Sequence, residues 1–573
     1  MLGWKLWLPV FLAYQALSLF IFGGPALRHP ADCYTGMGTD PTIHMWCLTW
    51  WPYALSHHLN PFLTKVVWAP TGVNLTWADS MAGLSLLGWP ITWAWGPVVS
   101  WNLLRWMEPS SAGLGAFLLC RYVTGGALWP SIFGGYLFGF SPYMLGHMLG
   151  HLSFVTTFPL PLAALVVLLK LDDRLAVWSF IGLFAGLVVL QFLSTQELLA
   201  DAAVIGFFVM VASIILAPSD LRSRLIKAAA LIGCAFGLAA VILSPYLYYE
   251  LRSVPHEPIR PPEHFSIDLL NLVIPTNLVK FNGDLWLNIA SRFDDGNGAE
   301  ATGYLGLPLL LIVWSYAITQ WSIFRTKVLT IALLLTIFAS LGPVFLIGGA
   351  KICTLPWSYV AKLPLIQNAL PCRFTVFAFL AAAVTAAVYL STGDTSWPKL
   401  VLALAVVISV LPNPQFSEWT TQVDTPVFFS SGVYKAFIRP DENVLVLPFG
   451  DKDQSMLWQA QSKMYFRMAG GYLGIPPPEF AMLPILQSLN SGQAGPHFND
   501  ELIRFLVDHG VTTIVAADQA NDPWPELLRP LKMRSIQSAG VVVYRAGGGE
   551  GGAPLWGVVP PRRHHRASSD RWR

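Results

Sequence analysis

The stretch GTDPTIHMWCLTWWPYALSHHLNPF, residues 38–62, is a polar, tryptophan-rich interruption in an otherwise apolar chain. It lies in segment 25–80, between a first apolar segment and a long series of others. Indole rings favour a membrane interface, so residues 43–59 are expected to lie flat on the outer leaflet. Water-soluble groups held there can meet a substrate carried by lipid. We therefore predict that segment 25–80 carries an active site.

The composition is typical of a membrane protein. Of the 573 residues, 54% are hydrophobic and 12% are charged, whereas about 25% are charged in soluble domains. The net charge of +2 gives no reason to expect a nucleic-acid partner. A helix that spans a bilayer needs about 20 apolar residues. Runs of this kind without a charged side chain are 6–26, 175–193, 229–248, 303–324, 328–350 and 374–393. The predicted fold class is a polytopic α-helical membrane protein.

Basic residues in the short connections predict the orientation, because such residues favour the cytoplasmic side. They lie at 170–174, 222–227, 325–327 and 399. With these connections inside, the N-terminus is cytoplasmic in the plasma membrane, the inner membrane of a bacterium. About eleven transmembrane helices are expected, at 6–26, 98–120, 131–146, 154–169, 175–193, 198–217, 229–248, 303–324, 328–350, 374–393 and 398–414.

This threading predicts a transmembrane domain over residues 1–414, with outer loops at 25–80 and 249–302. An extracytoplasmic α/β domain is expected over 415–547, where the charge rises and β-branched runs predict strands. Residues 548–573 are glycine-rich and then basic, and we expect them to be disordered. The predicted strands are Asn443–Phe449, Val511–Ala516 and Gly540–Arg545.

Two acids of the first outer loop are candidates for chemistry. Asp40 precedes the tryptophan-rich stretch, where its carboxylate can accept a proton from a hydroxyl group arriving from water. Alternatively, Asp40 only caps the helix that follows. Asp79 closes the same loop, and its alternative role is that of a solvated loop acid.

Two pairs of ionisable residues have helical spacing at predicted outer boundaries. Glu197 and Asp201 are four residues apart, as are His147 and His151, so each pair shares one helix face. Ionisable groups within a spanning segment are costly and usually functional. These four residues could bind a divalent cation, Mg²⁺ or Mn²⁺. Histidine pairs at this spacing also occur on ordinary interfacial helices, so a structural role stays open.

Arg373 opens the charge-free helix 374–393 from outside. A guanidinium group binds phosphate through two parallel hydrogen bonds and stays charged at any relevant pH. The alternative is that Arg373 only snorkels to the lipid headgroups.

Several short motifs, together with the order of parts, resemble uncharacterised bacterial members of one superfamily. The order is one helix, an outer loop with an early Asp, many helices, and an outer soluble domain. Over about residues 1–415 the chain resembles the GT-C superfamily, the integral-membrane glycosyltransferases that use polyprenyl-phosphate-linked sugars. The motifs are Gly38-Thr39-Asp40-Pro41, Trp50-Trp51 and Asn60-Pro61-Phe62; Phe140-Ser141-Pro142-Tyr143 with His151; Gln196-Glu197-Leu198; Gly303-Tyr304-Leu305-Gly306-Leu307; and Leu363-Pro364 with Arg373-Phe374.

The resemblance implies transfer of a sugar, with inversion, from a polyprenyl-phosphate donor in the membrane lipid to an extracytoplasmic acceptor. That acceptor would be a glycan, lipid or protein of the cell envelope. Asp40 matches the early outer-loop acid that serves as general base, and Asp32 is the second candidate. Arg373 would hold the donor and stabilise the leaving phosphate. The expected substrate-binding residues are Arg373, Glu197, His151 and Asp79.

Two other classes of protein stay open. A transporter or lipid flippase would typically carry inverted repeats and broken helices that face each other at mid-membrane, and the sequence has no such repeat. A non-catalytic envelope-assembly protein would keep the fold without the chemistry, and an Asp40 remote from any cavity would favour it.

Overall fold

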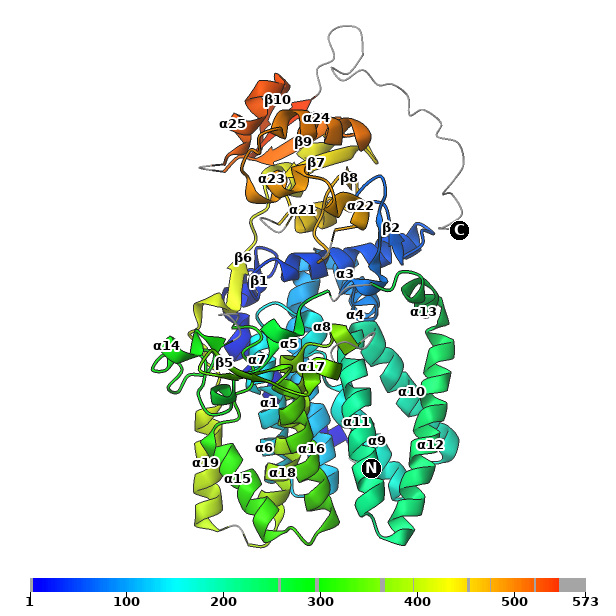
Figure 1. Cartoon of the computed structure of the whole chain (residues 1–573), viewed down its shortest axis with the longest axis vertical. Coiled ribbons are helices and arrows are strands. Elements are labelled where there is room, and N and C mark those ends of the chain that lie inside the picture. Colours follow the sequence, from blue (N-terminus) through cyan, green and yellow to red (C-terminus); the bar gives the residue numbers. More distant parts are fainter. Residues whose placement is uncertain are drawn as a thin grey trace. The chain divides into compact units, whose positions relative to one another are not determined.

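The chain divides into two compact units in its computed structural model (Figure 1). Unit 1 comprises the described residues up to Pro52 and from Asp79 to Val423, and unit 2 comprises those of Tyr53–Ala78 and those from Asp424 onward. The predicted tail 548–573 and the Leu363-Pro364 motif lie outside the described residues. The described residues are 4–255, 259–293, 298–360, 366–394, 396–450, 454–474, 476–519 and 522–545.

Unit 1 is an assembly of α-helices, many of them running side by side (Figure 1). Its helices are α1 (Trp4–Ser18), α2 (Gly24–Arg28), α3 (Asp40–Ser56, which continues into unit 2), α4 (Ala82–Leu87), α5 (Trp89–Val123), α6 (Leu128–Gly139), α7 (Pro142–His147), α8 (Leu152–Val155), α9 (Pro159–Leu171), α10 (Val177–Ser194), α11 (Gln196–Leu216), α12 (Ser219–Ile242), α13 (Ser244–Leu251), α14 (Leu287–Ala290), α15 (Leu307–Thr319), α16 (Phe324–Ser340), α17 (Trp357–Val360), α18 (Thr375–Ser391) and α19 (Trp397–Ser409).

Membrane crossing follows from the length and composition of these helices. Within the described residues, six helical segments are long and apolar enough to cross a bilayer, and two shorter apolar helices, α15 and α19, accompany them. The chain is therefore a multi-pass membrane protein. The six segments are Lys5–Arg28, Leu152–Leu171, Val177–Ser194, Gln196–Leu216, Ser219–Ile242 and Pro371–Ser391.

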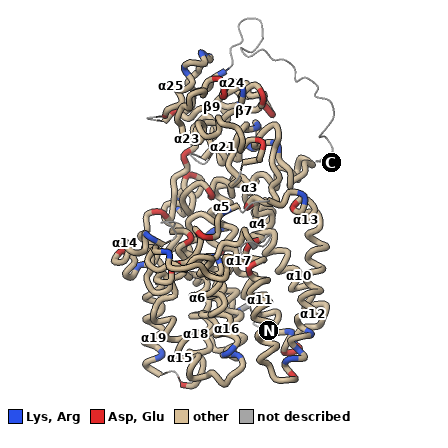
Figure 2. The backbone as a smooth tube through the Cα atoms, viewed as in Figure 1, with Lys and Arg blue, Asp and Glu red and all other residues tan. Residues whose placement is uncertain are grey.

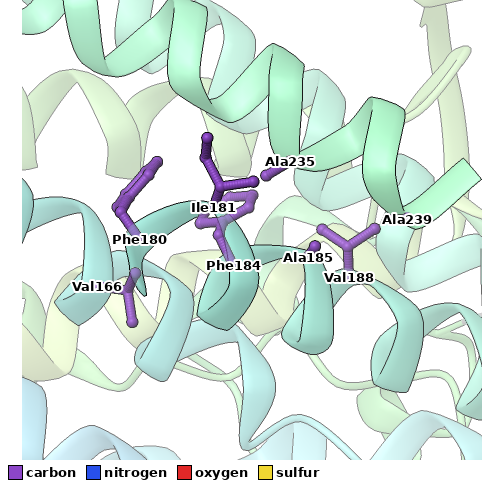
Figure 3. Close-up of a cluster of buried hydrophobic side chains, with 8 residues drawn as sticks. All are labelled: Val166, Phe180, Ile181, Phe184, Ala185, Val188, Ala235 and Ala239. Carbon is purple, nitrogen blue, oxygen red and sulfur yellow. The ribbon is translucent and has the colours of Figure 1, made fainter. Parts of the chain in front are cut away.

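Helix α10 shows how these helices pack. Its Phe180, Phe184 and Val188 recur at helical spacing on one face and meet Ala235 and Ala239 of α12 (Figure 3). Lipid tails are as apolar as these side chains, so burial from water does not drive the contact. Close van der Waals packing against the two small alanines stabilises it instead.

The predicted helix 328–350 is wrong in its second half. Helix α16 ends at Ser340, and strands β4 (Val344–Ile347) and β5 (Ala350–Thr354) follow as an antiparallel hairpin. Gly348 and Gly349 form the turn with φ angles of +61° and +81°, which two-residue hairpin turns require and glycine adopts without strain. An apolar composition alone does not distinguish such a hairpin from a spanning helix.

The expectation that residues 43–59 lie flat on a membrane surface is wrong for the tryptophan-rich part. Trp46, Trp50 and Trp51 of α3 are at most 4% exposed. The rings of Trp46 and Trp50 stack with centroids 5.6 Å apart. The indole nitrogen of Trp51 donates a hydrogen bond to the carbonyl of Ser80. Protein therefore covers these rings.

Unit 2 is built on a five-stranded sheet of order β10-β11-β9-β7-β8, in which β7 runs parallel to β8 and β9. The predicted strands overlap β7, β9 and β11. The sheet consists of β7 (Asn443–Leu447), β8 (Arg467–Met468), β9 (Thr513–Ala517), β10 (Arg534–Ser538) and β11 (Val541–Arg545). The helices of unit 2 are α20 (Val427–Ser430), α21 (Ser455–Gln461), α22 (Pro478–Ala481), α23 (Ile485–Ser491), α24 (Phe498–Asp508) and α25 (Trp524–Leu528).

The first outer loop supplies part of unit 2. Its backbone forms a small hairpin of β2 (Leu63–Thr64) and β3 (Val73–Asn74). Between these strands, Ala69 donates a backbone hydrogen bond to Met468, and Met468 donates one to Val66. The loop therefore extends the sheet alongside β8. In unit 1, β1 (Cys33–Thr35) pairs with β6 (Thr420–Gln422).

Basic residues gather at one end of the helices of unit 1 (Figure 2). Arg224 donates to the carbonyl of Leu171, and Arg325 donates to that of Val123, so connections distant in sequence meet there. Glu197 lies in the first turn of α11, whose 21 residues extend about 30 Å toward that end. That this end is cytoplasmic stays a prediction from the basic residues.

We expect a reporter fused after Lys399 to be cytoplasmic and one fused after Phe416 to be exported. The basic connections would then lie on the inner face and the β6 segment on the outer face. Paired phosphatase and fluorescent-protein fusions measure this directly. The opposite pair of results would invert the topology and place the candidate site in the cytoplasm.

Candidate functional site

A short turn between α7 and α8 carries the two predicted histidines. The hydroxyl of Ser141 accepts from the amide of Met144 and caps α7. The amide of His151 donates to the carbonyl of His147 at 2.9 Å, so the turn keeps helical spacing. The Nδ1 atoms of His147 and His151 lie 3.1 Å apart. The structure thus places the predicted pair in direct contact.

Asp40 meets this pair from the first outer loop. Its Oδ2 lies 3.0 Å from Nε2 of His151, and 38% of its side chain is exposed. The approach depends on Gly36, with a φ of +108°, where an added Cβ would lie 2.4 Å from the carbonyl oxygen of Leu149. Thr35, the residue before Gly36, is held by α5, because the indole nitrogen of Trp101 in that helix donates to the carbonyl of Thr35.

Glu300 completes the cluster, and the sequence analysis missed it. Its Oε2 lies 3.7 Å from Nε2 of His147, and its side chain is 2% exposed. Gly146 allows the approach, since a Cβ there would lie 2.6 Å from the carbonyl oxygen of Ala299. The available signal was an isolated acid three residues before the Gly303 motif.

Arg373 joins the cluster to the predicted acid of α11. Its guanidinium donates to Glu197 at 2.5 Å and to Glu300 at 2.8 Å. The ring of Phe154 lies beneath it, 3.7 Å from Cζ to the ring centroid. The amide of Leu370 donates to the second oxygen of Glu197. Arg373 is therefore buried among protein groups, which does not fit a side chain that snorkels to lipid headgroups.

The predicted metal set needs a correction. Within the part of the chain that the structure describes, His147, His151 and Glu300 are brought together, with ligand atoms all within 4.8 Å of one another. Glu197 is engaged by Arg373 instead. Asp201 is buried one turn further along α11. Glu300, rather than Glu197 or Asp201, accompanies the histidines, because its Oε2 lies beside Nε2 of His147 while its Oε1 accepts from Arg373. We call Asp40, His147, His151 and Glu300 the histidine–carboxylate cluster.

The hydrogen bonds of this cluster can be assigned around a neutral His147. Burial, the largest influence, lowers the pKa of His147 well below its usual value, so this ring is neutral. If Nε2–H of His151 donates to Asp40, its Nδ1 accepts from Nδ1–H of His147. The lone pair on Nε2 of His147 then faces Glu300. That nitrogen is buried and has no hydrogen-bond partner.

The cluster suits a divalent cation. Among the described residues, Nε2 of His147 has no donor, and Oε2 of the facing Glu300 accepts only from the thiol of Cys372, at 3.1 Å. A cation between these two acceptors would satisfy both. Asp40, in turn, orients His151, as carboxylates orient metal-binding histidines in many sites. Nε2 of His147 is free in this arrangement, and Nδ1 of His151 would become free once a cation displaced its contact with His147. Two such nitrogen donors favour a first-row ion such as Mn²⁺ over Mg²⁺, which prefers oxygen ligands.

Electrostatics keep the two carboxylates of the cluster ionised. Burial by itself would raise the pKa of Asp40, but the hydrogen bond from His151 and the influence of His151, His44 and Arg260 lower it to about 2. Burial likewise opposes ionisation of Glu300, and Arg373 overcomes it and lowers the pKa of Glu300. Both groups are therefore anionic at neutral pH.

Asp79 lies in a second polar contact beside the cluster. Its Oδ2 accepts from Ser153 at 2.5 Å and lies 3.0 Å from Nε2 of His44. Burial would raise the pKa of Asp79, but His44 lowers it below its usual value. Ser153 lies two residues after His151. The start of α8 is therefore anchored to the first outer loop twice, by His151 to Asp40 and by Ser153 to Asp79.

Asp32, the second candidate for a general base, is not brought to the cluster. It is exposed beside β1, and its backbone carbonyl accepts from the amide of Val423. Among the contacts of the described residues, its carboxylate has no hydrogen bond. Its charge is therefore free to be solvated.

Comparison with solved structures shows which known fold the chain shares. Arabinofuranosyltransferase AftD from Mycobacteria matches with a TM-score of 0.61 at 13% identity, over 96% of this chain and 42% of its own. The apo oligosaccharyltransferase of Archaeoglobus fulgidus matches with a TM-score of 0.51 at 11% identity, over 89% of this chain and 69% of its own. The chain therefore has the fold of the GT-C glycosyltransferases, and it spans less than half the length of AftD.

The chain belongs to the family described as Domain of unknown function (DUF6311), whose model matches residues 11–411. A comparison with curated proteins finds no significant match.

We expect the purified protein to bind one Mn²⁺ ion at this cluster. Replacing His151 with alanine removes a ligand and should weaken binding by about tenfold or more. Electron paramagnetic resonance titration of free Mn²⁺ measures the affinity. The control is His58→Asn, which changes an exposed histidine outside the cluster. Equal affinities for wild type and His151→Ala would exclude the cluster as the binding site.

Two neighbouring glycines provide a matched test of the geometry. Gly146→Ala should displace the backbone that carries Glu300, because the new Cβ would lie 2.6 Å from the carbonyl oxygen of Ala299. In Gly150→Ala, the nearest atom is 3.6 Å away, an ordinary contact. We therefore expect Mn²⁺ affinity to fall in the first variant and to persist in the second. Loss in both, or in neither, would contradict the assigned role of Gly146.

Proposed function

We propose that the chain is a membrane glycosyltransferase that moves a sugar, with inversion, from a polyprenyl-phosphate donor to an extracytoplasmic acceptor. One observation carries the proposal. The partly exposed carboxylate of Asp40 is held by His151, among the ionisable groups that gather at the ends of α7 and α18 in a GT-C fold.

In this proposal Asp40 is the general base. The acceptor oxygen attacks the anomeric carbon while the bond from that carbon to the phosphate oxygen breaks, and the hydroxyl proton passes to Asp40. A carboxylate with a pKa of about 2 is a weak base toward a free alcohol. The hydroxyl becomes strongly acidic only as its oxygen bonds to carbon, so the proton moves late in the step. His151 keeps the carboxylate ionised and oriented.

The leaving phosphate needs positive charge. The guanidinium of Arg373 was expected to supply it, but two carboxylates engage both its terminal nitrogens. We therefore propose that Arg373 mainly positions Glu300. Arg260 is exposed and its charge acts on Asp40, which makes it the better candidate for contact with the phosphate.

A divalent cation would be held by His147, His151 and Glu300. When bound, it would supply positive charge for a phosphate group. The cation would not change the roles proposed for the side chains: Asp40 accepts the proton, and Arg373 keeps Glu300 ionised.

The neighbours support the class of reaction. They are named as an arabinofuranosyltransferase and an oligosaccharyltransferase, so both act on sugars, and the polyprenyl-phosphate donor follows from the GT-C resemblance of the sequence. The acceptor would be a glycan, lipid or protein of the cell envelope. We place the site on the outer side of the plasma membrane, opposite the basic connections.

Asp40→Asn keeps the shape and hydrogen bonding of the side chain but removes its ability to accept a proton. We expect turnover to fall by about 10²–10⁴-fold, measured as sugar release from a polyprenyl-phosphate donor by the purified protein. Asp32→Asn is the matched control in the same loop and should retain turnover, because Asp32 is exposed and lies outside the cluster. A wild-type rate for Asp40→Asn would remove Asp40 as the base.

A further inference from the structure

We infer that unit 2 holds a binding site for a neutral saccharide. A hollow with a volume of about 530 Å³ opens in this unit, within the range of small-molecule sites. Its walls combine two aromatic residues, Trp68 and Tyr472, with amide and hydroxyl side chains. The lining residues used below are Trp68, Gly450, Gly474, Gln487 and Asn490.

Trp68 lines the hollow and has an unfavourable backbone conformation. Its φ is +53°, a value that bulky residues rarely adopt unless the surroundings enforce it. Its amide donates to the carbonyl of Gly470, and the next amide donates to Met468. The indole packs edgewise on Phe480 with centroids 5.0 Å apart. These contacts fix the ring in one place.

The indole nitrogen of Trp68 lacks a partner. The side chain is 4% exposed, and its N–H is buried with no hydrogen bond. An unsatisfied buried donor is unfavourable, and buried tryptophans usually find a partner for this group. A ligand hydroxyl that reaches the floor of the hollow would satisfy it.

Helix α23 supplies exposed amide side chains at the rim. Gln487 and Asn490 both line the hollow and are exposed. Asn490 lies against the backbone of Gly450, where a Cβ would come within 2.4 Å of its Oδ1. On the other side Gly474, with a φ of +90°, has nothing within 4 Å of where its Cβ would be. Gly474 therefore leaves its part of the rim clear of the described residues, and Asn490 lies at the rim beside Gly450.

This chemistry fits a neutral sugar. A sugar ring has an apolar C–H face, which packs on an aromatic ring, and a rim of hydroxyls, which bond to amides. None of the described residues that line this hollow carries a charge, as expected for a site that binds a neutral ligand. A second hollow of about 330 Å³ shares Pro476, Leu486, Gln487 and Asn490 with the first, which gives room for more than one sugar unit.

The inference is independent of the chemistry proposed for Asp40. All lining residues belong to unit 2, whereas the histidine–carboxylate cluster belongs to unit 1. A glycan site of this kind could retain an acceptor or a product whether or not Asp40 is the base.

The experiment uses the full chain in lipid nanodiscs, so that no sugar-headed detergent competes. The labelled protein is applied to an array of immobilised neutral oligosaccharides of hexoses and pentoses. We expect wild type to be retained on at least one of them. Asn490→Ala and Trp68→Phe should each lower the affinity by about five- to tenfold, the loss of one hydrogen bond. Asn499→Ala, an exposed asparagine on α24 outside the hollow, should bind as wild type.

Asp40→Asn separates this site from the proposed catalytic site. Unchanged glycan binding in Asp40→Asn, with weakened binding in Asn490→Ala, would support the inference even if no glycosyl transfer were found. Three results would overturn it: no oligosaccharide retains the wild type above empty nanodiscs, both pocket variants bind as wild type, or binding is lost in Asp40→Asn but kept in Asn490→Ala.

Discussion

The buried guanidinium of Arg373 is the constraint on which the candidate site depends. It lies between the carboxylates of Glu197 and Glu300 and therefore ties α11, the start of α18 and the second outer loop together. Removing one partner of a buried ion pair typically costs about 3–5 kcal/mol, because the remaining charge is left uncompensated. Glu300 consequently has little freedom, and its position beside His147 follows from the pair with Arg373. The contacts continue from His147 to His151 and from His151 to Asp40. The position of the proposed base therefore depends on the ion pair between Arg373 and Glu300.

Glycines make these contacts possible by letting backbone segments approach closely. Gly146 admits the segment that carries Glu300, and Gly36 admits Leu149 against the first outer loop. In both places the obstacle to any other residue is a backbone carbonyl, which cannot rotate away as a side chain can. The site is thus assembled from three segments distant in sequence, and the segments come into contact at two glycines, Gly36 and Gly146. This explains why ionisable groups from α3, α7 and the second outer loop share one small volume.

The first outer loop serves two structures. Its beginning, with Asp40, belongs to the helical unit, and its later part extends the sheet of unit 2 and carries Trp68. A protein that acts on a sugar has use for both features, a carboxylate for the chemistry and an aromatic ring for holding a glycan. The two proposed activities rest on separate residues, so we expect that they can be lost separately.

The sequence by itself determined the class of protein and three of the four residues of the histidine–carboxylate cluster, all but Glu300. Apolar runs without charge define membrane helices wherever they are long, and spacing of four residues paired His147 with His151, because helical periodicity is a local property. It could not assign Glu300, since nothing in the residues around Glu300 records its contact with His147 or Arg373, far away in the chain. It also mistook the β4–β5 hairpin for helix, because both are apolar, and it placed α3 at a surface, because tryptophans fit an interface and a protein interior equally well. Only the tertiary structure decided these points, since burial and ion pairing arise when distant segments meet.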